Sequence, residues 1–67
     1  MTVEEIGLAA GEVWGALSTG NGGVSLAALK KSVEAPADLV LLALGWLARE
    51  DKVEIDASAK APTISLK

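Results

Sequence analysis

The chain has 67 residues, of which 51% are hydrophobic, and a formal net charge of −3, with neither histidine nor cysteine. This composition excludes disulfides, the usual zinc and iron sites, and catalysis by a Ser–His or Cys–His pair. We therefore expect one non-enzymatic domain over residues 1–67, without catalytic residues, cofactor or metal, whose thin core leaves apolar surface for a partner.

The charges are distributed unevenly along the chain. Residues 1–20 contain Glu4, Glu5 and Glu12 and no basic residue, whereas all six basic residues come later among six further acidic ones. Because no basic run exists, strong nonspecific attraction to nucleic acid phosphates is not expected. The acidic start is unlike a signal peptide, and the longest apolar run, residues 39–48, is too short to span a bilayer. We expect a cytoplasmic protein that does not associate with membranes.

The first predicted helix starts at a capping box formed by Thr2 and Glu5 and runs to about Ser18. Residues 20–23, Gly-Asn-Gly-Gly, end it because they tolerate positive φ. Apolar residues at helical spacing predict its inward face. They are Val3, Ile6, Ala10, Val13, Trp14 and Leu17.

A stripe of glycines, Gly7, Gly11 and Gly15, recurs every four residues along this helix. Each glycine costs the helix roughly 1 kcal/mol relative to alanine, so the stripe requires a reason. One interpretation is a second interaction surface, where another element approaches the backbone closely. The other, which we prefer, is that Trp14 and Trp46 need the space inside one subunit.

A short strand and a short helix are predicted next. Val24 is expected in a strand of one or two residues, and Ser25 is a good N-cap for a helix over about residues 26–33. Pro36 suits the first turn of a third helix, which reaches about Glu50. In the second helix the expected inward residues are Leu26, Leu29 and Val33.

The last part of the chain predicts a β-hairpin. Asp51 and Lys52 form a turn, and residues 53–56 and 63–66 alternate between apolar and polar side chains on either side of a small loop. The complete order is helix, short strand, helix, helix, strand, strand. It predicts a mainly helical α+β fold, the winged helix-turn-helix, in which the C-terminal hairpin is the wing.

Three stretches carry a resemblance to a family. They are Ile6-Gly7 with Ala10-Gly11-Glu12-Val13-Trp14, then Ser25-Leu26-Ala27-Ala28-Leu29-Lys30-Lys31, and Ala43-Leu44-Gly45-Trp46-Leu47-Ala48-Arg49-Glu50-Asp51-Lys52. In these the chain resembles a family of small stand-alone prokaryotic winged helix-turn-helix proteins, over nearly its whole length. The resemblance implies the fold but no particular activity. The broader winged-helix class contains DNA-binding regulators, an analogy of fold only.

The outer face of the third helix bears on function, because this helix enters the major groove in DNA-binding members of the class. If Val40 is central to the buried side, with Ala43, Leu44 and Leu47 beside it, the opposite side is unlike a base-reading surface. Base readers present Arg, Lys, Asn or Gln there. This side instead carries Asp38, Leu42, Gly45 and Arg49, flanked by Leu41.

The same residues suit a two-fold helix pair. Asp38 and Arg49 lie symmetrically about the point between Ala43 and Leu44, and so do Leu42 and Gly45. We therefore expect a regulatory or adaptor module that forms a homodimer through this face and binds an unidentified protein partner. The alternative is a DNA-binding transcription regulator. Its phosphate contacts would come from Lys30, Lys31, Arg49, Lys52 and Lys60, while Trp14 and Trp46 are expected in the core or at an interface.

Overall fold

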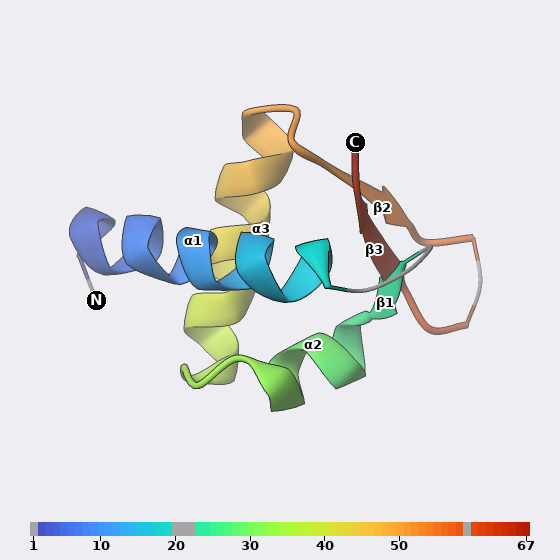
Figure 1. Ribbon diagram of the computed structural model, residues 1–67, viewed down its shortest axis with the longest axis horizontal. Helices are drawn as coiled ribbons and strands as arrows, with labels where there is room; N and C mark the ends of the chain where they lie inside the picture. The colour runs from blue at the N-terminus through green and yellow to red at the C-terminus, as the bar shows by residue number, and fades with distance from the viewer. Residues whose placement is uncertain (1, 20–22, 59) are drawn as a thin grey trace.

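The computed structural model describes residues 2–19, 23–58 and 60–67, and its elements follow the predicted order (Figure 1). Helix α1 crosses α3, α2 lies beside them, and the strands gather near the end of α1 (Figure 1). The element bounds are α1 Val3–Ser18, β1 Val24–Ser25, α2 Leu26–Ser32, α3 Ala37–Arg49, β2 Val53–Asp56 and β3 Thr63–Leu66.

Side-chain caps fix the starts of the first two helices. The Thr2 hydroxyl accepts a hydrogen bond from the Glu5 backbone N–H at 3.1 Å, and the Ser25 hydroxyl accepts one from the Ala28 N–H at 3.1 Å. Both predicted N-caps are therefore confirmed. Pro36 is the N-cap of α3 and precedes its first turn; its carbonyl accepts from the Val40 N–H at 3.1 Å.

The turn after α3 directs the chain into the sheet. Asp51 adopts a left-handed conformation, with φ of 62°, which lets the Lys52 N–H donate to the Leu47 carbonyl at 3.0 Å and close the helix end. Gly23, with φ of 118°, has the positive φ expected before β1. The other residues predicted to end α1, 20–22, lie outside the described part of the chain.

The sheet has the order β1-β3-β2, and both neighbouring pairs are antiparallel. Strand β3 is therefore central: Ile64 lies opposite Val24 on one side and Ile55 on the other. The predicted hairpin of β2 and β3 is confirmed.

The core lies where α1 packs on α3, with α2 and the sheet closing it. Val13, Leu29 and Val40 are wholly buried. The prediction of the inward face of α1 is wrong at two residues, since Val3 is 66% exposed and Trp14 is 46% exposed. The buried stripe instead runs through Ala9, Ala10, Val13 and Leu17, because this side of α1 faces α3 and the rest of the core.

Candidate functional site

The outer α3 face, defined here as Asp38, Leu41, Leu42, Gly45 and Arg49, is exposed at all five positions. Leu41 and Leu42 are 44% and 46% exposed. The four α3 residues predicted to face inward, Val40, Ala43, Leu44 and Leu47, are buried, so the predicted orientation of the helix is confirmed.

The chemistry of this face is set by two charges, two leucines and a gap. Asp38 lies in the first turn of α3 and Arg49 in the last, so each has the sign that the helix dipole favours. Within residues 2–19, 23–58 and 60–67, neither forms an ion pair shorter than 4.0 Å. A Cβ added at Gly45 would meet no atom within 4 Å, so the surface has space there for a partner's side chain.

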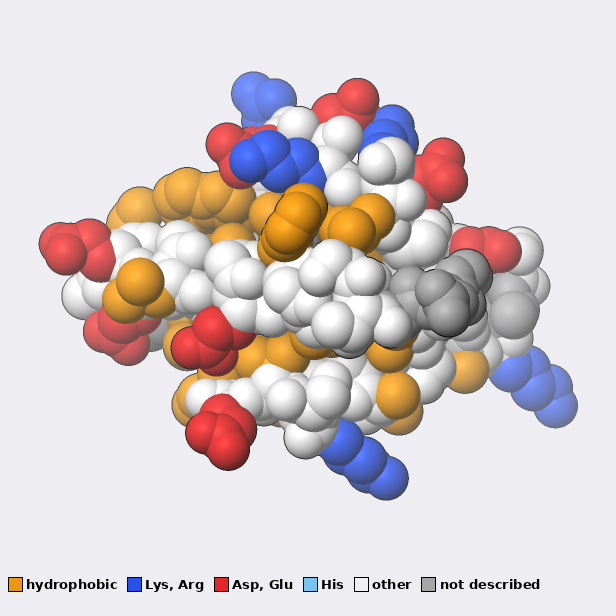
Figure 2. Space-filling view, viewed as in Figure 1, with side chains coloured by type: hydrophobic (Ala, Val, Ile, Leu, Met, Phe, Trp, Pro, Cys, Tyr) orange, Lys and Arg blue, Asp and Glu red, His pale blue; other side chains and the backbone are white. Residues whose placement is uncertain are grey.

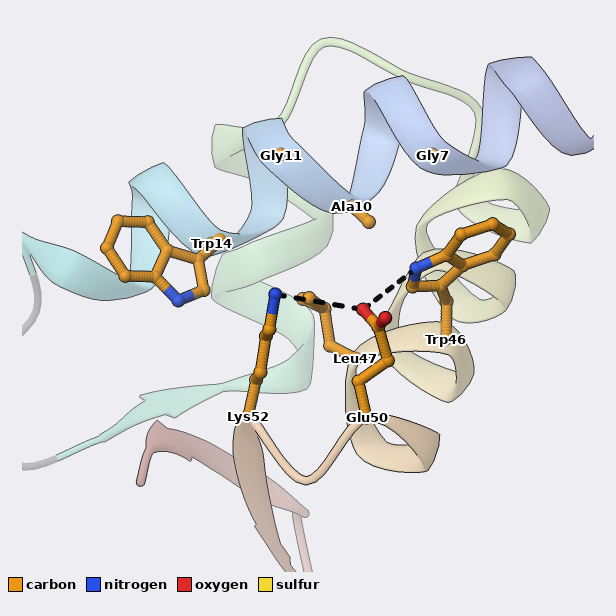
Figure 3. Close-up of a pocket in the computed structure, with 8 residues that line it drawn as sticks. All are labelled: Gly7, Ala10, Gly11, Trp14, Trp46, Leu47, Glu50 and Lys52. Atoms are coloured by element: carbon orange, nitrogen blue, oxygen red, sulfur yellow. Dashed lines mark hydrogen bonds and ion pairs between the residues drawn. The ribbon is translucent and has the colours of Figure 1, made fainter.

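A second feature is the tryptophan groove between α1 and α3 (Figure 3). Its volume is about 290 Å³. The Trp46 Nε1–H donates to Glu50 Oε1 at 3.1 Å, and Lys52 Nζ lies 3.8 Å from the same oxygen. Trp14 and Trp46 stand on opposite sides of these groups (Figure 3). At 46% and 37% exposure they are not core residues, so the core interpretation of the tryptophans is wrong.

The glycine stripe is open to solvent. A Cβ added at Gly7, Gly11 or Gly15 would meet no atom within 4 Å, so the described part of the chain leaves these positions uncrowded. Gly7 and Gly11 do line the tryptophan groove, but no neighbouring side chain requires them to be glycine. The preferred explanation, space for the tryptophans inside one subunit, is therefore not supported. Use of the stripe as an interaction surface stays a prediction.

The five basic residues named for DNA contact are dispersed. Lys30 and Lys31 are exposed in the last turn of α2, Lys60 is exposed in the hairpin loop, and Arg49 is on the outer α3 face. Lys52 instead lines the tryptophan groove beside Glu50. The outer α3 face thus holds a single basic side chain, among the five residues that define it.

Hydrogen bonds and a neighbouring charge shift the pKa values of Asp56 and Lys67. The Ser58 hydroxyl and N–H donate hydrogen bonds to Asp56 and lower the pKa of that carboxyl. The hydrogen bond and charge of Asp51 raise the pKa of Lys67. Both belong to the hairpin and its connection to α3, where they fix local structure.

Sequence reasoning missed a third feature, a hollow beside α1 whose lining includes Leu8, which is 73% exposed. The signal was present, since Leu8 interrupts an otherwise polar side of α1. Two further features are absent from residues 2–19, 23–58 and 60–67. No group of three or more His, Cys, Asp or Glu side chains is arranged to hold a metal ion. None of the helices there has both the length and the apolar character needed to cross a bilayer.

Three helices and a three-stranded sheet with a C-terminal hairpin define a winged helix-turn-helix domain. The chain belongs to the family described as winged helix-turn-helix domain (DUF2582), whose model matches residues 1–66. It is similar to protein BT2368 from Bacteroides thetaiotaomicron, known from a solution NMR structure. The two share 36% identity with a TM-score of 0.83, over 98% of this chain and 79% of that one.

A more distant structural match is the crystal structure of AF1382 from Archaeoglobus fulgidus. Its TM-score is 0.64 at 18% identity, over 100% of this chain and 71% of that one, which establishes a shared fold alone. No curated protein matches the chain. These similarities confirm the predicted family resemblance and fold, and they are compatible with a regulatory or DNA-binding module.

Proposed function

We propose that this winged helix is a non-enzymatic regulatory or adaptor module that forms a homodimer through the outer α3 face. The observation that carries the proposal is the pair of exposed leucines, Leu41 and Leu42, beside the open position at Gly45. A helix that reads bases presents hydrogen-bonding side chains at these positions, whereas apolar side chains next to a gap favour packing against another protein surface.

The geometry supports an antiparallel pair of α3 helices related by a two-fold axis. The axis would cross the outer α3 face at the level of the Ala43–Leu44 peptide bond. In that arrangement Leu42 of each subunit fills the open position over Gly45 of the other. Asp38 faces Arg49 across the axis at both ends of the contact. The contact is isologous, so every favourable interaction occurs twice.

The apolar surface continues beyond this helix pair. Trp46 lies four residues after Leu42 on the same side of α3 and is 37% exposed, so the leucine contact adjoins one wall of the tryptophan groove. A 13-residue helix spans only about 20 Å, which places a pair of such helices at the small end of specific interfaces. We therefore expect association that depends on concentration in the micromolar range.

Sedimentation equilibrium over a wide concentration range tests the proposal. The wild-type chain should approach twice the monomer mass, and Leu42→Glu should shift it to monomer because a carboxylate would be buried at the axis. Ile55→Glu is the matched control, since Ile55 is 48% exposed but lies on β2. An unchanged mass for Leu42→Glu, or equal losses in both variants, would refute dimerisation through α3.

A charge exchange tests the antiparallel register separately. Asp38→Arg and Arg49→Asp should each weaken the dimer, because like charges then meet at both ends of the contact. The double variant restores opposite charges and should recover association. If it is as weak as the single variants, Asp38 and Arg49 do not face each other.

The second candidate function is a DNA-binding transcription regulator. It is favoured by the family's fold and by the exposed Lys30, Lys31 and Lys60 on α2 and in the wing. An NMR titration with a mixed-sequence duplex of about 16 base pairs at low salt distinguishes the two functions. Shifts in α3, α2 and the wing that vanish steeply with added salt would favour DNA binding, because phosphate contacts release counterions. An apolar dimer should persist in the same salt.

A further inference from the structure

The hollow beside α1 shares no lining residue with the outer α3 face. It is formed where α1 meets the connection between α2 and α3, and its volume is about 200 Å³. Its apolar lining includes Leu8, Pro36 and Leu39, and its charged lining consists of Glu5, Glu12 and Glu34. We call this surface the acidic hollow.

The apolar lining of the acidic hollow is unusually accessible. Leu8 is 73% exposed, a larger fraction than any other large hydrophobic side chain in the described part of the chain. Leu39 is half-buried and packs against the core, and Ala9 beneath them is 3% exposed. The hollow therefore combines one exposed leucine with apolar residues that are held in place by the core, and a partner's apolar side chain can be buried against them.

The rim of the hollow is negative and has no internal counter-charge. Glu5, Glu12 and Glu34 are exposed, and within residues 2–19, 23–58 and 60–67 none has a lysine or arginine within 4.0 Å. Figure 2 shows acidic side chains over α1 and below it, with hydrophobic side chains between them. Such a field attracts cationic partners and repels nucleic acid and anionic lipid.

We propose that the acidic hollow is a docking site for a basic amphipathic helix of a partner protein. An apolar side chain of that helix would enter between Leu8 and Leu39. Glu5 and Glu12 are seven residues apart on α1, and therefore about 10 Å apart along its axis. A partner helix lying along α1 matches this spacing with two basic residues that are also two turns apart, and a third basic residue meets Glu34.

A second copy of this chain does not provide such a helix. Its adjacent bases, Lys30 and Lys31, lie on α2, whose Leu29 is buried and whose Leu26 is partly buried. On α3 the exposed Leu42 is accompanied by one base, Arg49, and by Asp38. The occupant is therefore a different protein. None of the residues that line the hollow belongs to the outer α3 face.

The probe is a fluorescein-labelled, alanine-based helical peptide of about 15 residues. It carries two leucines four residues apart and three lysines, two of them seven residues apart; a matched peptide has glutamate in place of each lysine. Fluorescence anisotropy at low salt should show binding of the lysine peptide alone. Amide NMR shifts should map to α1 and the α2–α3 connection. Absence of binding, or shifts that map to the outer α3 face or the wing, would overturn the proposal.

Surface variants test which residues bind the peptide. Glu12→Lys and Leu8→Ser should each weaken binding at least about fivefold, the first by replacing an attractive charge with a repulsive one and the second by removing the apolar contact. Glu54→Lys is the matched control, because Glu54 is an exposed carboxylate on β2, and it should change affinity less than twofold. Equal losses for Glu12→Lys and Glu54→Lys would overturn the site, since only net charge would then matter. Binding of anionic vesicles or duplex DNA at the hollow would also overturn it.

Discussion

Replacing the glycine stripe by alanine should stabilise the protein, because nothing in the described structure occupies the space beside it. Gly7, Gly11 and Gly15 are all inside α1, and an added Cβ at each would meet no atom within 4 Å. Alanine is better than glycine in a helix interior by roughly 0.5–1 kcal/mol, mainly because it restricts the unfolded chain. The triple variant should therefore gain about 2 kcal/mol in the free energy of unfolding.

For a domain of this length, 1 kcal/mol corresponds to a shift of roughly 4–8 °C in Tm. Thermal and urea denaturation followed by circular dichroism should therefore show Tm rising in each single variant, and by roughly 8–16 °C in the triple variant. Gly23→Ala is the opposing control. Gly23 has φ of 118°, and its added Cβ would lie 3.6 Å from the Ile64 carbonyl oxygen, so alanine there should lower Tm.

A lower Tm in any single stripe variant would refute this reasoning, because it would mean that the glycines are required by contacts inside the folded chain. A higher Tm would mean that the glycines lower the stability of the folded chain, so that their presence would have to be explained by function. If the triple variant is more stable but loses a partner that the wild type binds, the stripe is the second interaction surface considered from the sequence.

Other substitutions test the packing, the turn and the electrostatics. Leu29→Ala should cost about 2–5 kcal/mol because Leu29 is wholly buried; a loss below 1 kcal/mol in urea denaturation would contradict its place in the core. In a Lys67→Ala background, which has already lost the Asp51–Lys67 ion pair, Asp51→Gly should gain roughly 0.5–1 kcal/mol by relieving the left-handed conformation at φ of 62°, and a decrease in Tm relative to that background would contradict this. Ser58→Ala should raise the pKa of Asp56 toward its ordinary value in a carboxyl NMR titration. Folding lowers the pKa of Asp56, so the ionised carboxylate stabilises the folded state at pH values above the unfolded pKa. This stabilisation is lost as the pH falls through the folded pKa. An unchanged pKa would show that Ser58 is not its cause.

Local sequence signals predicted the elements well. The caps at Thr2 and Ser25 and the alternation in the two hairpin strands each depend on residues close together in the chain, and each is confirmed. The orientation of α3 was also predictable, since a helix with an apolar stripe buries that stripe. The binding partner of its exposed face was not predictable, because the residues of an exposed face do not specify which molecule covers it.

The errors come from contacts between distant segments. Trp14 lies near the apolar stripe of α1, but which edge of the stripe is buried depends on how α3 packs across it, and the buried edge is the one that carries Ala9 and Ala10. The acidic hollow likewise requires Glu34 to lie near α1, although 22 residues separate it from Glu12. Helical periodicity describes one element at a time and cannot predict either arrangement.

The central position of β3 makes the whole sheet depend on the last strand of the chain. Val24 in β1 pairs with Ile64, 40 residues later, and β2 also pairs with β3. The contact between α1 and α3, by contrast, involves none of residues 63–66. A chain truncated before Thr63 would therefore retain the residues of the helix pair but leave both edge strands without the strand that lies between them, a form prone to aggregation and proteolysis.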